Sequence, residues 1–244
     1  MSEKVVEIKG LYKSFGDQEV LKNLSLDLYK GENLVVLGKS GTGKSVLIKC
    51  LVGLIDLDAG EINVLGTHIE HADDKTMTEV RKKVGFLFQS AALYDSMSVR
   101  ENLEFPLKRI ETNISKSDMN TRVSEALENV GLLDSIDKMP SQLSGGMRKR
   151  VGLARTIVLN PEIILYDEPT TGLDSITSHE ISELILSLQQ KFNTSSIIIT
   201  HDMPCAKHTA NRIIILADGK EIGEGTFEAL QNSSDTIINS FFKH

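Results

Sequence analysis

Cysteine and long apolar runs are both scarce in this sequence, and each shortage excludes a class of protein. The 244 residues include two cysteines, Cys50 and Cys205, which could form one bridge at most. A disulfide scaffold is therefore excluded, and so little cysteine is typical of a reducing compartment. Apolar runs such as residues 197–199 and 213–217 are far shorter than the ~20 residues that a membrane-spanning helix requires. We therefore expect no segment that crosses a bilayer.

Positive charge is in the minority, and no secretion signal is recognisable. Lys and Arg number 27 against 34 Asp and Glu, which gives a formal net charge of −7. This acidic balance argues against a protein that coats nucleic acid, so we expect no nucleic-acid partner. Residues 1–7 lack the apolar core of a signal peptide, and we expect no export on that ground. With 40% hydrophobic and 25% charged residues, the chain has the composition of a globular protein.

The order of apolar patterns predicts an α/β fold that is interrupted by a helical segment. Alternating or wholly apolar runs predict strands at residues 5–8, 20–28, 33–37, 61–65, 84–88, 163–166, 195–200 and 212–217. Helical spacing predicts helices at residues 46–54, 99–107, 116–130, 145–159 and 175–190, and two short ones from residue 226 onward. The later strands are uniformly apolar, which is typical of a parallel sheet buried on both faces. We expect an α/β core from residues 1–88 and 160–244, and a helical subdomain from residues 89–159.

A glycine-rich turn between the strand at 33–37 and the helix at 46–54 has the pattern of a phosphate-binding loop. Its residues are Gly38-Lys39-Ser40-Gly41-Thr42-Gly43-Lys44-Ser45, which match G-x-x-x-x-G-K-[ST] without a mismatch. Inward backbone N–H groups and the positive end of the helix dipole bind phosphate in such a turn. We expect Lys44 to contact the β- and γ-phosphates of a nucleotide and Ser45 to bind Mg²⁺. An ordinary glycine turn would not require the complete pattern.

Two acidic residues, Asp167 and Glu168, follow the strand at 163–166 and complete the expected site. Bringing two neighbouring carboxylates together is costly unless a cation or a function requires it. We expect Asp167 to hold Mg²⁺ through water and Glu168 to polarise the water that attacks the γ-phosphate. Taken alone, an Asp-Glu pair after an apolar run is commonly solvated, so this interpretation depends on the phosphate-binding loop.

Several further segments resemble motifs of the ABC ATPases and follow the order of that family. Leu143-Ser144-Gly145-Gly146-Met147 resembles the signature motif, although its methionine replaces the more frequent glutamine. Gln89 matches the Q-loop glutamine, Gly172-Leu173-Asp174 the D-loop, and His201 the switch histidine. Phe15 matches the aromatic residue that stacks on adenine. The sequence is therefore identified as a member of the ABC ATPases, and the resemblance covers nearly the whole chain.

The resemblance implies a fold, a reaction and a shared site. The fold is a P-loop NTPase core of the RecA-like kind, with a mostly parallel sheet, an antiparallel β subdomain and a helical insertion. The reaction is hydrolysis of ATP with Mg²⁺, in which His201 contacts the γ-phosphate and Gln89 binds the metal ion. Each ATP would lie between the phosphate-binding loop of one copy and Ser144, Gly145 and Gly146 of another, with Asp174 at the contact. The implied partner is a second copy of this chain.

Read singly, these residues have simpler interpretations, which stay open. Gln89 could be a solvated or capping side chain, and His201 a packed histidine at a strand end. Phe15 could pack in the core or at an edge of the fold. Asp174 precedes the helix predicted at 175–190 and could cap it, with or without a contact to a second copy.

The loop sequences resemble one branch of the family more than others. Residues 87–102 and 139–150 are similar to those of the ATPases of Mla (Mce-associated) phospholipid transporters. This similarity implies a separate transmembrane permease, an Mce-domain lipid-binding protein as a further partner, and a peripheral location at the cytoplasmic face of the bacterial inner membrane. An ATPase of an importer for polar amino acids or other small solutes shares every ATP motif. An ATPase that moves protein or nucleic acid is a further alternative.

The remaining candidates have more modest expected roles. Phe105, Pro106 and Leu107 are either contacts for a coupling helix of the permease or part of a helix core. Cys50 is expected in the core, and Arg148-Lys149-Arg150 on a solvated or dimer-facing surface. The histidines His68, His71 and His179 lack the spacing of metal ligands, so no further metal centre is expected.

Overall fold

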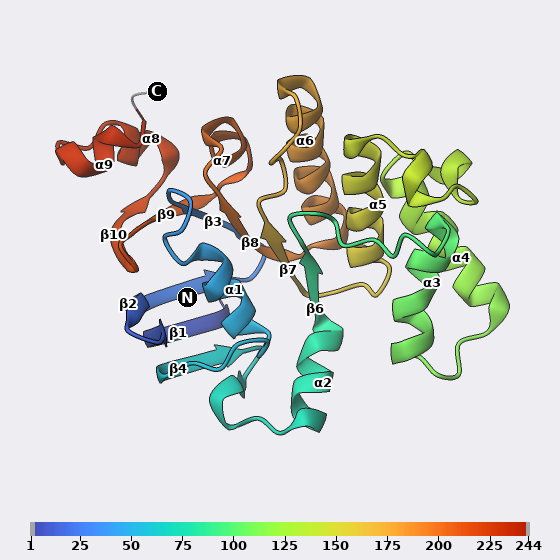
Figure 1. The fold of residues 1–244 in the computed structure, drawn as a ribbon, viewed down its shortest axis with the longest axis horizontal. Helices are drawn as coiled ribbons and strands as arrows, with labels where there is room; N and C mark the ends of the chain where they lie inside the picture. The colour runs from blue at the N-terminus through green and yellow to red at the C-terminus, as the bar shows by residue number, and fades with distance from the viewer. Residues whose placement is uncertain (1–2, 243–244) are drawn as a thin grey trace.

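The computed structural model describes residues 3–242, which form two sheets with helices around them (Figure 1). The smaller sheet is antiparallel, in the order β2-β1-β4-β5. Its strands are β1 (Lys4–Phe15), β2 (Gln18–Tyr29), β4 (Ala59–Val64) and β5 (Thr67–His68). Phe15 pairs with Gln18, so β1 and β2 form a hairpin that turns over two residues, the first of which is Gly16 with φ 58°.

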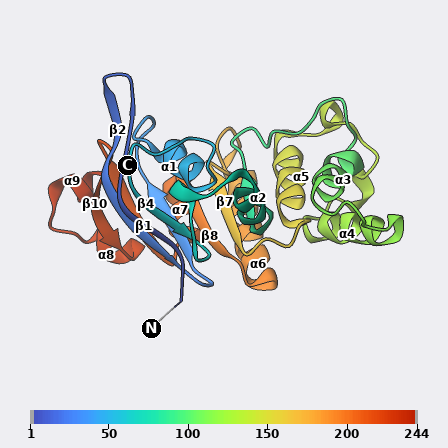
Figure 2. The same cartoon turned by 90° about the horizontal axis from the view of Figure 1, so that it is seen from below.

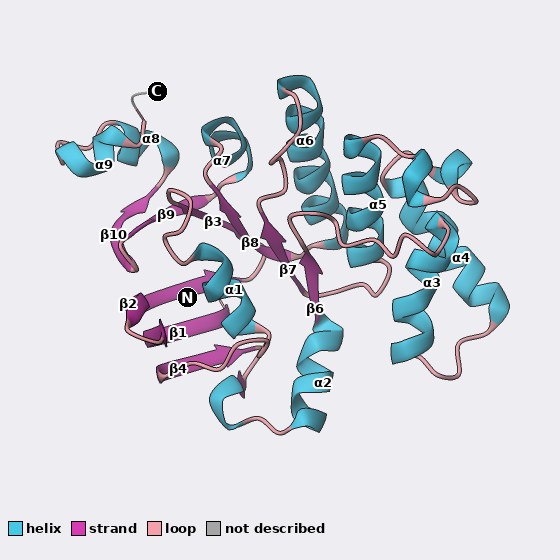
Figure 3. Ribbon diagram, viewed as in Figure 1, coloured by secondary structure: helices cyan, strands magenta, loops and turns pink. Residues whose placement is uncertain are grey.

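The larger sheet has the order β10-β9-β3-β8-β7-β6 and is parallel except for its last edge strand, β10, which runs antiparallel to β9 (Figure 3). Its strands are β3 (Asn33–Leu37), β6 (Val84–Leu87), β7 (Ile163–Asp167), β8 (Ser195–Thr200), β9 (Arg212–Ala217) and β10 (Lys220–Gly225). Because β3, β7 and β8 are parallel neighbours, the loops at their carboxyl ends meet at one edge of the sheet.

Alternation along the central strands divides the interior into two cores. Leu34 and Val36 of β3 point to the core that lies under the antiparallel sheet and α1, whereas Val35 and Leu37 point to the core under the helices. This is the period of two that an extended strand imposes. Figure 2 shows the parallel sheet lying between the antiparallel sheet and the helical part of the chain.

Nine α-helices are described. Most of them cover the face of the parallel sheet that lies opposite the antiparallel sheet. They are α1 (Lys44–Leu51), α2 (Asp74–Lys83), α3 (Val99–Ile110), α4 (Lys116–Asn129), α5 (Gly145–Ile157), α6 (Ser175–Phe192), α7 (Met203–Thr209), α8 (Phe227–Gln231) and α9 (Thr236–Ser240). Short 3₁₀ turns lie at Ile69–His71, Leu133–Ser135 and Pro140–Gln142. Helix α5 packs against β6, α3, α4 and α6, so it joins the helical segment to the sheet.

The expected architecture is present, with four elements that the sequence patterns did not predict. The mostly parallel sheet, the antiparallel sheet and the helices between β6 and β7 are all found. The unpredicted elements are β5, α2, α7 and β10. Within residues 3–242, no helix combines the length and the apolar character that crossing a membrane requires.

Candidate functional site

The turn between β3 and α1 is shaped by glycines that no other residue could replace without strain. Gly43 has φ 99°, and a Cβ there would lie 2.9 Å from the carbonyl oxygen of Val20. A Cβ on Gly38 would lie 2.6 Å from the carbonyl oxygen of Leu216, and Gly41 has φ 82°. The backbone can therefore wrap closely around the start of α1, which is the geometry that holds phosphate oxygens on N–H groups.

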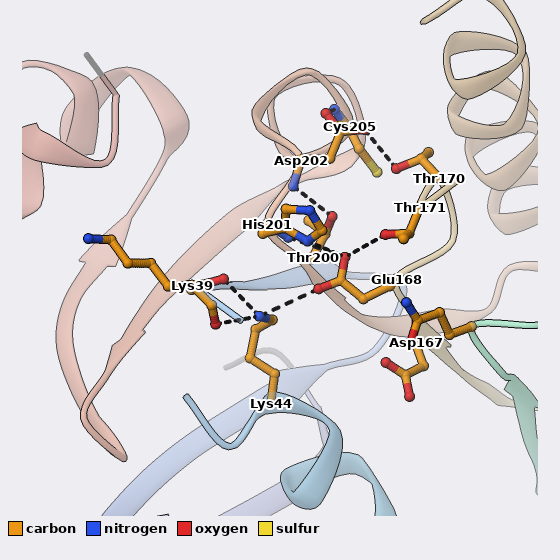
Figure 4. A network of polar contacts seen from close by, with 12 residues as sticks. Lys39, Lys44, Asp167, Glu168, Thr170, Thr171, Thr200, His201, Asp202 and Cys205 are labelled. Atoms are coloured by element: carbon orange, nitrogen blue, oxygen red, sulfur yellow. Dashed lines mark hydrogen bonds and ion pairs between the residues drawn. The ribbon is translucent and has the colours of Figure 1, made fainter. Parts of the chain in front are cut away.

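Lys44 is the buried cation of this turn, and its ammonium is held at three points (Figure 4). Nζ donates to the carbonyl oxygens of Gly38 at 2.7 Å and Lys39 at 2.9 Å. It also lies 3.5 Å from Oε1 of Glu168. The ammonium is thus fixed above the glycine loop and directly beside the expected catalytic carboxylate.

Ser45 and Asp167 come together as the sequence predicted for a metal site. Ser45 Oγ donates to Asp167 Oδ1 at 3.1 Å, although the two residues are 122 positions apart. Burial raises the pKa of Asp167, the hydrogen bond from Ser45 opposes that shift, and the charge of Glu168 adds to it. A hydroxyl and a buried carboxylate next to a phosphate loop are the oxygen ligands that Mg²⁺ prefers, so the residues present fit that ion.

Glu168 is turned into the site by an unusual backbone conformation. Its φ of 48° lies in the left-handed region, which non-glycine residues rarely adopt and which is concentrated at functional sites. The carboxylate accepts from Thr171 Oγ1 at 3.2 Å, and its Oε2 lies 2.9 Å from Nδ1 of His201. Glu168 therefore stands between Lys44 and His201, as Figure 4 shows.

The signature turn and the D-loop lie side by side. Ser144 caps α5, and its Oγ accepts from the N–H of Met147 at 3.2 Å. Asp174 caps α6 by accepting from two backbone N–H groups at 3.0 Å each, as the simple interpretation expected. A Cβ on Gly146 would lie 2.6 Å from Cγ2 of Thr177, so glycine permits this close approach of α5 to α6.

The signature turn does not meet the phosphate-binding loop of the same chain. In Figures 1 and 2, α5 and α1 lie apart with β7 between them. Among the hydrogen bonds of residues 3–242, none joins Ser144, Gly145 or Gly146 to residues 38–45. A nucleotide shared between the phosphate-binding loop of one chain and the signature turn of a second chain stays a prediction.

Phe15 and Gln89 are both exposed at the surface. Phe15 is 50% exposed at the end of β1, and the ammonium of Lys13 lies 5.4 Å from the centre of its ring. The side chain of Gln89 is exposed directly after β6. Their roles toward adenine and Mg²⁺ stay predictions.

Lys149 is the functional candidate that the sequence analysis missed. It was expected on a surface, but it is 5% exposed. Its ammonium donates to the carbonyl oxygen of Gln89 at 2.5 Å and to that of Glu168 at 3.1 Å. Burial lowers its pKa to about 8, against the opposing charges of Asp167 and Glu168. The side chain thereby joins α5 to the Q-loop and to the strand end that carries the expected catalytic carboxylate.

A surface pocket lies where contacts to another protein were predicted. It has a volume of about 290 Å³, and Phe88, Tyr94, Phe105 and Pro106 contribute to its lining. The rings of Tyr94 and Phe105 are 5.0 Å apart. Of the two roles that the sequence left open for Leu107, the structure supports the helix core, because this side chain is fully buried beneath α3.

Residues 21–171 match the family model described as ABC transporter. This chain belongs to the ABC transporter family. It is an ATP-binding subunit of an ABC transporter that hydrolyses ATP with Mg²⁺.

Similar curated proteins are transport ATPases. The chain is 39% identical to a probable ribonucleotide transport ATP-binding protein, Mkl, of Mycobacterium leprae, over 97% of this chain and 68% of that protein. It is 38% identical to the intermembrane phospholipid transport ATP-binding protein MlaF of Haemophilus influenzae, over 100% of this chain and 92% of that protein. It is 36% identical to the methionine import ATP-binding protein MetN of Brucella abortus, over 99% of this chain and 65% of that protein.

A solved structure with a similar fold is a dimer. It is the ATP-binding cassette MJ0796 in a post-hydrolysis state bound to ADP and Pi, with a TM-score of 0.83 and 33% identity. The match covers 91% of this chain and 98% of that one. The likeness confirms the P-loop ABC ATPase fold that the motifs implied.

Replacing Lys149 with Met is expected to lower the kcat of ATP hydrolysis about ten-fold while the KM for ATP changes less than about two-fold. The reason is that Met fills the space of the stem but leaves the carbonyls of Gln89 and Glu168 without their donor, so Glu168 loses its position. Steady-state kinetics check this. The matched variant Lys149→Gln keeps an N–H donor and should retain most of the activity. An equal loss in both variants would contradict the role of the donor.

The lowered pKa of Lys149 also predicts a pH dependence of stability. The ordinary pKa of a lysine is 10.5, and that of Lys149 in the folded chain is about 8. Between these two pH values, the ammonium of Lys149 keeps its proton in the unfolded chain and has released it in the folded chain. The unfolded state then binds more protons, so the free energy of unfolding rises with pH across this window. Relative to Lys149→Met, the unaltered chain should gain on the order of 2 kcal/mol between pH 7.5 and 10. Urea titrations of both proteins at the two pH values measure this difference.

Proposed function

We propose that this ABC ATPase powers phospholipid transport through a separate permease at the cytoplasmic face of the bacterial inner membrane, with an Mce-domain lipid-binding protein as a further partner. The observation that carries the proposal is the 38% identity to MlaF over all of this chain and 92% of that protein. The loop segments at residues 87–102 and 139–150 support the same branch. The relative named for methionine import, at 36% identity, supports the runner-up, an importer of small polar solutes.

The geometry of the site supports a division of labour in hydrolysis. Glu168 would orient and polarise the attacking water, because its carboxylate faces both Lys44 and His201. His201 would contact the γ-phosphate through the ring nitrogen that Glu168 leaves free. Lys44 would offset the charge that develops on the phosphate oxygens. Mg²⁺, held by Ser45 and Asp167, would supply further charge stabilisation when bound.

The shared site would be completed by a second copy. Ser144 and Gly145 are exposed, and they lie at the start of α5, where backbone N–H groups favour an anion. Asp174 lies on the same face, since Gly145 and Gly146 contact the D-loop and the first turn of α6. These residues would reach the γ-phosphate bound by the partner copy. ATP would thus hold two copies together, and hydrolysis would release them.

Coupling to the permease would occur at the pocket between β6 and α3. Phe105 and Pro106 line it from α3, and Tyr94 lines it from the loop that follows Gln89. An apolar helix end placed there would press on the segment whose carbonyl binds Lys149. Movement of the permease could reach the catalytic strand by this route.

Capture of the complex from detergent-solubilised membranes tests the proposal. We expect the permease and an Mce-domain protein to co-purify, with phospholipid identified by mass spectrometry of the extract. Phe105→Glu should lose the permease and keep ATP binding, whereas Ile237→Glu, at an exposed apolar residue on α9, should keep both. A periplasmic solute-binding protein in place of the Mce-domain protein, with turnover stimulated by an amino acid, would favour the runner-up instead.

A further inference from the structure

Three side chains outside the nucleotide site converge on one point between α6 and α7. His179 and Glu183 lie one turn apart on α6, and His208 lies near the end of α7. Oε1 of Glu183 is 2.5 Å from Nε2 of His208 and 3.8 Å from Nε2 of His179. The two imidazole rings are 4.9 Å apart. Potential ligand atoms of all three residues lie within 4.8 Å of one another.

The contact between His208 and Glu183 is short but is not a well-formed hydrogen bond. Nε2 of His208 is shielded from solvent and has no hydrogen-bond partner of acceptable geometry among residues 3–242. A buried ring nitrogen aimed at a carboxylate without such a bond is costly. A cation between the two atoms would satisfy both of them, because a neutral imidazole and a carboxylate each offer a lone pair.

We propose that His179, Glu183 and His208 form a site for a divalent transition-metal ion, with Zn²⁺ as its best occupant. Two imidazoles and one carboxylate are a common donor set for Zn²⁺, and the fourth position would be taken by water. Bonds of ~2.0 Å in a tetrahedron place ligand atoms about 3.3 Å apart. The observed separations of 2.5 and 3.8 Å bracket that value, so small rotations of the exposed side chains of His179 and Glu183 complete the geometry around His208.

This site is distinct from the Mg²⁺ site in both chemistry and position. Mg²⁺ favours oxygen ligands and retains water, so two imidazoles select against it. His179 lies five residues beyond Asp174, about 7 Å along α6, and His208 lies six residues beyond Asp202, at the far end of α7. The bound ion would tie together the helices that start at the D-loop and at the switch loop.

The sequence analysis expected no such site, and the proposal departs from that expectation because of how the chain folds. His179 and Glu183 are spaced i and i+4, but a single histidine and a glutamate on an exposed helix are common without a metal. The second imidazole comes from 29 residues further along the chain, after β8. Only the packing of α7 against α6 brings it to the same point.

Zinc binding to the untagged, nucleotide-free protein tests the inference. Isothermal titration with ZnCl₂ should show one site that MgCl₂ at millimolar concentration does not occupy. Zinc at about 100 times its Kd should raise the Tm by about 5 °C. His179→Ala and His208→Ala should each weaken binding at least about ten-fold, with melting temperatures in the absence of zinc close to that of the unaltered chain.

Two control variants separate this site from other histidines. His68 lies 3.0 Å from Glu70 but has no second imidazole, so His68→Ala should leave zinc binding unchanged. His201→Ala removes the ring beside Glu168 and should also leave the titrated site intact. Zinc binding that is abolished by His201→Ala and unaffected by His179→Ala would overturn the inference, as would the absence of zinc binding altogether. In the latter case the three residues form a surface ion pair only.

Discussion

Glu168→Gln is expected to lower the rate of ATP hydrolysis at least about a hundred-fold while ATP still binds. The amide keeps the size of the carboxylate and its contacts with Thr171 and His201, but it has no negative charge with which to polarise water. Lys44, 3.5 Å away, also loses a charged neighbour and becomes more available to phosphate oxygens. Steady-state hydrolysis and equilibrium binding of ATP measure the two effects separately.

The same variant should accumulate as an ATP-bound dimer, because the proposed shared site would hold two copies together until hydrolysis releases them. Light scattering with saturating ATP and Mg²⁺ measures the change in mass. The matched control is Glu162→Gln, at the other end of the same strand, where the carboxylate forms an exposed ion pair with Lys83. This control should hydrolyse ATP like the unaltered chain. A Glu168→Gln protein that hydrolyses ATP normally would refute the catalytic role, and one that stays monomeric with ATP would refute the shared site.

The elements that the sequence predicted most accurately are those that are buried on both faces. Strands at 33–37, 195–200 and 212–217 were placed with the bounds that the structure shows, because wholly apolar runs have sharp polar limits. Two of the missed elements, α2 and β10, are polar. Helix α2 buries only Met77 and Val80, and β10 is an edge strand with little apolar content. Amphipathic periodicity is too weak in such segments to distinguish helix, strand and loop.

The candidate site likewise contains residues that the sequence predicted and one that it did not. Lys44, Ser45, Asp167 and Glu168 were predicted because each lies within a local motif, and the parallel sheet then brings the two motifs together. Lys149 was not recognised, because its partners are backbone carbonyls 60 and 19 positions away. A pattern of residue types cannot show that a lysine in a basic run is directed inward. That depends on how α5 is rotated against β6, which tertiary packing decides.

Lys44→Ala is expected to weaken ATP binding at least about a hundred-fold, which is about 2.7 kcal/mol. In the free protein the ammonium already has three partners, namely the carbonyls of Gly38 and Lys39 and the carboxylate of Glu168. These contacts hold the ammonium in place before ATP arrives, so little conformational entropy is lost on binding. Contacts of the Lys44 ammonium to two charged phosphates are stronger than its contacts to neutral carbonyls. Replacing the carbonyl contacts by phosphate contacts therefore favours the ATP-bound state.

The best control for this loss is the neighbouring lysine of the same loop. The side chain of Lys39 points away from the ammonium of Lys44 in Figure 4, and only its backbone carbonyl takes part in the site. Lys39→Ala should therefore keep most of the affinity for ATP. Because Lys44→Ala also leaves the buried Glu168 without its nearby cation, the Tm of each variant must be measured beside the binding curve. A folded Lys44→Ala protein that binds ATP with unchanged Kd would show that the glycine loop is not the phosphate site.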